Sequence, residues 1–115
     1  LILVGIADED TVEDIEWLVR KCAGLRIFDD AEGVMNLDIR QVGGEVLAVS
    51  QFTLMAFDIR AAGEATALPL YRIFTERLAE LLGRPVATGV FGADMQVELI
   101  NDGPVTIWMD SRNRE

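Results

Sequence analysis

The sequence predicts a single α/β domain over residues 1–115, with a mixed, barrel-like β-sheet and helices packed on its outside. Two segments have the apolar spacing of amphipathic helices, and several short apolar segments have the character of strands. The two kinds alternate without regular βαβ repetition, which favours a mixed sheet over a doubly wound one. With 115 residues, half of them hydrophobic, the chain is long enough for one core.

In the first half of the chain, a helix lies between apolar strands. Thr11 is placed to cap that helix, with Asp14 three residues on as in a capping box, and Gly24 ends it. The helix turns one apolar face, including Ile15 and Val19, toward the protein. The strands expected here are Leu1–Ile6, Leu25–Phe28 and Glu45–Ser50. The last of these is mostly apolar, which predicts burial on both faces.

A longer helix occupies the second half. It begins at Glu64, carries Tyr71 and Phe74 on its apolar face, and is ended by Gly83 and Pro85. The strands expected after it are Val86–Gly89, Met95–Ile100 and Val105–Met109. The second alternates apolar and polar residues, and the third is rich in β-branched residues. The tail, residues 110–115, is expected to be mobile.

Asn101-Asp102-Gly103-Pro104 lies between the last two predicted strands. Asn, Asp and Gly accept left-handed backbone, and Pro fixes φ and removes a hydrogen-bond donor. One interpretation is a plain hairpin turn. The other is a rigid dipeptide, Gly103-Pro104, that presents bare backbone to a ligand.

Charge and composition exclude several kinds of function. The formal net charge of −10 argues against nonspecific binding to phosphate backbones. The chain has no histidine, which removes His-activated nucleophiles and His-based zinc sites. No cofactor or metal is expected, because the acidic run at 29–33 lacks the ligand order of a calcium loop. A single cysteine, Cys22, and no apolar run long enough to span a membrane fit a cytoplasmic protein.

Polar side chains gather where the buried strand Glu45–Ser50 ends. Ser50, Gln51 and Thr53 carry hydroxyl and amide groups in or just after that strand. One interpretation is that they satisfy neighbouring backbone groups as the strand ends. The other is that they form a polar wall of a ligand pocket held by a rigid element.

Two motifs resemble those of the D-aminoacyl-tRNA deacylase family. Ser50-Gln51-Phe52-Thr53-Leu54 is similar to the SQxTL motif, and Asn101–Thr106 is similar to NxGPxT. Further phrases in the family's order support the resemblance. They are Leu25–Phe28, Met35-Asn36, Val42–Gly44 and Phe91–Met95. The resemblance therefore covers nearly the whole chain and predicts that family's fold.

The resemblance implies a chirality checkpoint of translation. The expected reaction is hydrolysis of the ester that joins a D-amino acid, or glycine mischarged on tRNA-Ala, to the 3′ end of tRNA. It implies a homodimer whose active sites lie at the subunit interface, with Gly103 and Pro104 of each chain entering the partner's pocket as a cis dipeptide. Backbone carbonyls there would leave no room for an L side chain, so that specificity comes from a clash.

Site residues follow from the resemblance. The catalytic residues it implies are Thr53, Gln51 and Phe52, and the substrate-binding residues are Ser50, Met95, Asn101, Gly103, Pro104 and Thr106. Because no base is evident beside the Thr53 hydroxyl, a positioning role is favoured over a nucleophilic one. The 2′-OH of the terminal ribose could then activate the water, and backbone N–H groups near 51–53 could bind the oxyanion.

The chain departs from the family in two places. An N-terminal strand and hairpin expected before Leu1 are absent, and a basic loop is missing between Ala56 and Phe57. These departures favour an alternative function, a non-catalytic dimerisation or adaptor module that keeps the fold. A small-ester hydrolase with Asp94 as a carboxylate base is a third, poorly supported interpretation.

Overall fold

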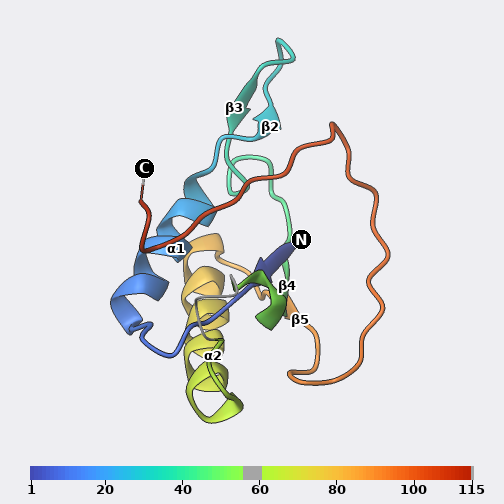
Figure 1. Cartoon of the computed structure of the whole chain (residues 1–115). Helices are drawn as coiled ribbons and strands as arrows, with labels where there is room; N and C mark the ends of the chain where they lie inside the picture. Colours follow the sequence, from blue (N-terminus) through green and yellow to red (C-terminus); the bar gives the residue numbers. More distant parts are fainter. Residues whose placement is uncertain (56–60, 115) are drawn as a thin grey trace.

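The structure is a computed structural model that describes residues 1–55 and 61–114 (Figure 1). Its strands are β1 (Ile2–Val4), β2 (Phe28–Asp29), β3 (Met35–Leu37), β4 (Leu47–Ser50) and β5 (Ala87–Thr88). Its helices are α1 (Val12–Gly24), the short 3₁₀ helix η1 (Phe52–Leu54) and α2 (Glu64–Leu82). The predicted junction between Ala56 and Phe57 lies outside the described residues.

Three strands form a parallel sheet in the order β1-β4-β5. Ile2 pairs with Ala48 and Val4 with Ser50, while Leu47 pairs with Ala87 on the other side of β4. β4 is thus the central strand, and its residues Ala48 and Val49 are buried as predicted. β2 and β3 form a separate antiparallel hairpin that projects from the body (Figure 1).

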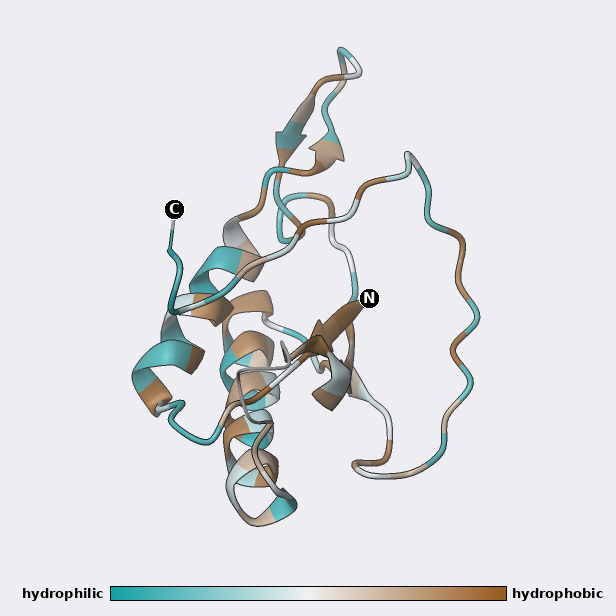
Figure 2. Cartoon of the chain, viewed as in Figure 1, coloured by the Kyte–Doolittle hydropathy of each residue, from teal (hydrophilic) through white to brown (hydrophobic). Residues whose placement is uncertain are grey.

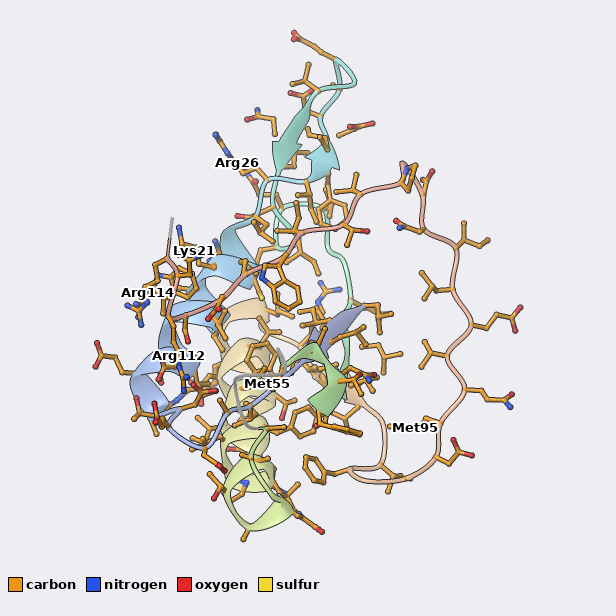
Figure 3. The ribbon with its side chains drawn as sticks, viewed as in Figure 1. Lys21, Arg26, Met55, Met95, Arg112 and Arg114 are labelled. Atoms are coloured by element: carbon orange, nitrogen blue, oxygen red, sulfur yellow. The ribbon has the colours of Figure 1, made fainter. Side chains whose placement is uncertain are left out.

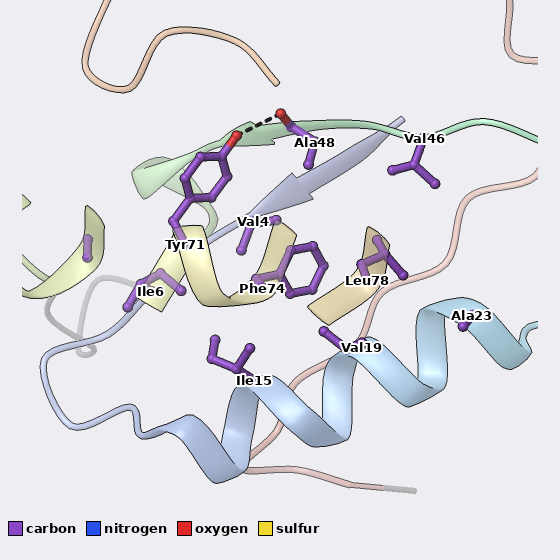
Figure 4. Close-up of a cluster of buried hydrophobic side chains, with 11 residues drawn as sticks. Val4, Ile6, Ile15, Val19, Ala23, Val46, Ala48, Tyr71, Phe74 and Leu78 are labelled. Atoms are coloured by element: carbon purple, nitrogen blue, oxygen red, sulfur yellow. Dashed lines mark hydrogen bonds between the residues drawn. The ribbon is translucent and has the colours of Figure 1, made fainter. Parts of the chain in front are cut away.

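The core lies between the sheet and both helices. Figure 4 shows α2 between the sheet and α1, with side chains of all three layers in contact. The largest fully buried side chains are Phe74 and Leu78 from α2 and Ile15 and Val19 from α1. The Tyr71 hydroxyl donates a hydrogen bond of 2.8 Å to the Ala48 carbonyl, which ties α2 to the central strand. The two predicted amphipathic faces therefore pack against each other and against the sheet.

Helix α1 begins as the sequence predicts. The Asp14 carboxylate accepts hydrogen bonds from the Thr11 backbone N–H at 2.9 Å and from the Thr11 hydroxyl at 3.1 Å. Burial acts to raise the pKa of Asp14. Hydrogen bonds from Thr11 and Ser111, together with the charge of Arg114, outweigh burial and hold the pKa below its usual value of 3.8.

Replacing Asp14 with asparagine is expected to destabilise the protein near neutral pH by about 0.5–1 kcal/mol. A carboxyl whose pKa is lowered by folding stabilises the native state above its unfolded pKa. That contribution is lost as the pH falls through the folded pKa. The stability difference between wild type and Asp14→Asn should therefore shrink below about pH 4, as measured by urea midpoints across pH. Glu13→Gln, in the same helical turn, is the control, and an equal effect from it would contradict the prediction.

The C-terminal region differs from the sequence prediction. Residues 94–109, called the arm below, leave the body as extended chain, and the predicted strands 95–100 and 105–109 do not form (Figure 1). Figure 2 marks apolar residues along the arm in brown, and several of them are exposed, Ile100 by 93%. Strands need a neighbouring edge for their backbone groups, and within the described residues nothing pairs with the arm.

The architecture is accordingly a mixed α/β fold with parallel and antiparallel pairing. The sheet of the described residues stays open, with β1 and β5 at its edges, so a closed barrel is not formed. Throughout residues 1–55 and 61–114, no helix has the length and apolar character that crossing a membrane requires.

Candidate functional site

A cavity of about 420 Å³ opens at the carboxyl end of β1 and β4. Leu3 and Val49 are partners in the parallel register, so their side chains share one face of the sheet and form its floor. The remaining walls come from η1, the start of α2 and the segment 91–97. A cavity at the carboxyl ends of parallel strands is a common place for a ligand site in α/β proteins.

The end of β4 forms one wall of the cavity. Ser50, Gln51 and Phe52 all line the cavity. Phe52 is 70% exposed, an unusual environment for a phenyl ring within one chain. Thr53 is exposed beside the cavity, and its hydroxyl accepts a hydrogen bond from the Gln51 carboxamide. These two side chains therefore orient each other.

Backbone N–H groups at this turn differ in their availability. The Gln51 N–H donates to the Val4 carbonyl at 2.8 Å, so it is occupied by the sheet. The N–H groups of Phe52 and Thr53 open the 3₁₀ helix η1 and have no acceptor among the described residues. Of the donors predicted near 51–53, only these two are free to bind an anionic oxygen.

Gly5 makes this turn possible, a role that the sequence does not reveal. A Cβ at Gly5 would lie 3.1 Å from the Leu54 Cβ and 3.2 Å from the Gln51 carbonyl oxygen. Only a residue without a side chain lets η1 pack this closely on the strand β1. The one signal in the sequence is a glycine inside an apolar strand, where close backbone approach is a common cause.

Met95 closes the cavity from the opposite side. Its side chain is in close contact with Gly89, where a Cβ would overlap the Met95 sulfur. The neighbouring Phe91 ring packs against Tyr71 of α2, with ring centroids 5.9 Å apart. Met95, a predicted substrate-binding residue, and Phe91, which was not predicted, both line the cavity. This contact is where the near end of the arm meets the body.

Gly103 and Pro104 lie far along the arm and do not line the chain's own cavity. The peptide bond between them is cis, and Gly103 has a φ of 128°. The Asn101 carboxamide holds the loop together, accepting from the Val105 N–H at 3.2 Å and donating to the Thr106 hydroxyl at 3.3 Å. Asn101 and Thr106 thus brace the dipeptide within one chain.

Carboxylates also line the cavity. Glu64, at the start of α2, and Asp94 are both among its walls, and Glu64 was not singled out in the sequence. In the described part of the chain, no group of histidine, cysteine, aspartate or glutamate side chains is arranged to hold a metal ion.

Burial raises the pKa of the Cys22 thiol to about 11, which makes it a poor nucleophile.

Comparisons with known proteins give the chain's relatives. A family model described as D-Tyr-tRNA(Tyr) deacylase matches residues 1–110. A D-aminoacyl-tRNA deacylase of Akkermansia muciniphila is 58% identical, and one of Parabacteroides distasonis is 53% identical. Each alignment covers all of this chain and 82% of the relative.

A solved structure also resembles the fold. The chain matches the c-Myc DNA Unwinding Element Binding Protein with a TM-score of 0.85 and 40% sequence identity. That match covers 91% of this chain and 76% of the other.

Proposed function

The chain belongs to the D-Tyr-tRNA(Tyr) deacylase family, and from this we infer that it hydrolyses the ester bond of D-aminoacyl-tRNA. It is an enzyme that releases the D-amino acid and free tRNA. We further propose that it acts in the cytoplasm, where aminoacyl-tRNA is used.

We propose that the working unit is a homodimer with an active site at each interface. One observation carries this proposal: Ser50–Phe52 line a cavity, while the Gly103-Pro104 loop stands outside that cavity at the tip of an exposed arm. Exposed apolar residues of the arm, such as Ile100 and Trp108, favour burial against a partner. The predicted barrel-like sheet belongs to the same proposal, since no strand among the described residues pairs with the arm.

The proposed chemistry needs no catalytic base from the protein. The 2′-OH of the terminal ribose would orient the attacking water, and the free N–H groups of Phe52 and Thr53 would bind the developing oxyanion. The hydrogen bond from Gln51 to Thr53 supports a positioning role for both side chains. Ser50 and Met95 would then shape the walls around the aminoacyl group.

Selectivity in this proposal comes from the main chain. The braced Gly103-Pro104 carbonyls would occupy the space that an L side chain requires, and would leave a D side chain free to point outward. Glycine has no side chain, so glycyl-tRNA mischarged on tRNA-Ala would pass the same filter. Asn101 and Thr106 act through the loop that they brace.

We also propose that a loop is missing between Ala56 and Phe57 relative to the family. The alignments with relatives run over 123 residues, eight more than the 115 of this chain, which supports a deletion or gap within it. Intact-mass measurement of the purified protein is the direct test, since 12.7 kDa corresponds to the chain without that loop.

Deacylation of D-Tyr-tRNA against L-Tyr-tRNA tests the function. The expected result is release of D-tyrosine at a rate roughly 100-fold above that of L-tyrosine, because a backbone clash of about 3 kcal/mol corresponds to two decades. Thr53→Ala should slow release without abolishing it, in keeping with a positioning role.

Equal rates for the two tRNAs would remove the stereochemical filter from the proposal. Complete loss in Thr53→Ala, with substrate still bound, would make the Thr53 hydroxyl a direct participant. A folded dimer with no deacylation at all would favour the adaptor module instead.

A further inference from the structure

The tail, residues 110–114, is fastened to the start of α1 by charged contacts. The Arg112 guanidinium lies 3.3 Å from the Asp10 carboxylate and 3.8 Å from that of Glu9. Arg114 lies 3.8 Å from Asp14, and its guanidinium stacks over the Trp17 ring at 4.9 Å. Figure 3 shows both arginines beside α1, on the side of the molecule opposite Met95.

Two of the acidic partners, Asp10 and Asp14, are also held by backbone N–H groups of their own segment. The Asp10 carboxylate accepts a hydrogen bond of 2.8 Å from the Ala7 N–H, and its side chain is only 12% exposed. Asp14 is held by Thr11 in the same way. Because only the arginine side chains lose freedom on docking, these pairs cost less entropy than ordinary surface pairs.

The near end of the arm packs on the body. Met95 packs on Gly89 and Val97 lines the cavity. Beyond Val97, the hydrogen bonds of the arm in the described structure are those of the Asn101 loop itself. Its far end continues into the tail, which begins six residues after Pro104.

We propose that Arg112 and Arg114, held by Asp10, Asp14 and Trp17, form a clamp that positions the Gly103-Pro104 loop for chiral selection. The inference rests on the proposed function of that loop. Asp10 is hydrogen-bonded to the Ala7 N–H, so the clamp ties the arm to the body of its own subunit, from which the loop reaches the partner. Arg112 and Arg114 are positioning residues, since neither touches the substrate.

The double variant Arg112→Ala/Arg114→Ala tests the clamp. Its ratio of D- to L-Tyr-tRNA hydrolysis is expected to fall about 3- to 10-fold, as two weak charged contacts are lost. Unfolding of part of the sample lowers both rates equally, so the ratio reports positioning and not fold. The lysine double variant, which keeps both charges, should recover most of the ratio. Wild type in 1 M salt should lose selectivity as the double variant does.

A charge-matched control is Arg20→Ala/Arg72→Ala, on the exposed faces of the two helices, which should keep the wild-type ratio. A wild-type ratio in the clamp variant overturns the inference while leaving the deacylase function intact. Absence of D-selective release by wild type overturns the function instead. In that case the clamp is tested by limited proteolysis with a Glu-specific protease, which can cut the arm after Glu98. Faster cleavage of the Arg112→Ala/Arg114→Ala variant than of wild type supports the clamp, and equal cleavage rates overturn it.

Discussion

Gly103→Ala is expected to lower hydrolysis of D-Tyr-tRNA about 100-fold, the loss that follows when a reacting group is misplaced by about 1 Å. Gly103 has a φ of 128°, a conformation that alanine rarely adopts. A Cβ at this position would also lie 2.9 Å from Val105 Cγ2 and 3.1 Å from the Val105 backbone nitrogen. The loop must therefore move, and single-turnover deacylation measures the result.

Gly33→Ala is the matched control. Gly33 also has a positive φ, 76°, but lies in the β2–β3 turn with no atom within 4 Å of an added Cβ. It should carry a similar backbone penalty without a change in hydrolysis. If Gly103→Ala kept wild-type rates and selectivity, the loop would have no part in catalysis.

Mixing two inactive variants tests whether the site is shared. A Gly103→Ala subunit keeps a native cavity, and a Phe52→Ala subunit keeps a native loop, so a mixed dimer has one complete site. Random exchange should restore roughly a quarter of wild-type activity. Absence of any recovery after verified exchange would place the whole site within one subunit.

Phe74→Ala is expected to destabilise the protein by about 3–5 kcal/mol, as deletion of a buried aromatic ring does. Phe74 is 1% exposed and lies between the sheet and α1, where the surrounding layers cannot collapse into the space left (Figure 4). Because domains of this size are stable by only about 5–15 kcal/mol, much of the folded state is at risk. Urea denaturation monitored by circular dichroism measures the loss.

Phe52→Ala is the same substitution in an exposed environment. Its free energy of unfolding should change by less than about 0.5 kcal/mol, while deacylation falls because the cavity loses a wall. The two substitutions together therefore distinguish a residue that stabilises the core from one that serves the site. Comparable destabilisation by both substitutions would show that the Phe52 ring is buried in the working protein.

Elements that bury a face within the chain could be predicted from the sequence. The capped start of α1, the glycine end of α2 and the buried strand β4 lie close to their predicted positions, because each pattern finds its partner in the same core. The arm could not be predicted in this way. Alternation shows which face of 95–100 favours burial, but not which sheet edge it pairs with, and in the described chain the arm pairs with none.

The candidate site was partly predictable. The polar end of β4 and Met95 meet in one cavity, as the motifs suggest. For Gly103 and Pro104 the motif was the only signal in the sequence. Hydrophobic periodicity does not show how the chain is connected in space, so it could not predict that these two residues lie outside the cavity. The roles of Gly5 and Gly89 could not be predicted. Each needs the absence of a side chain because of atoms of residues further along the chain, and only the structure places those atoms.

The parallel pairing of β1 with β4 also bears on the timing of folding. Leu3 forms part of the cavity floor, but its partner Val49 and the wall residue Val97 are synthesised much later. Residues so distant in sequence must lose the entropy of closing a long loop before their contact contributes any stability, and this slows folding. On the ribosome, a nascent chain therefore holds no complete cavity until residue 97 has emerged.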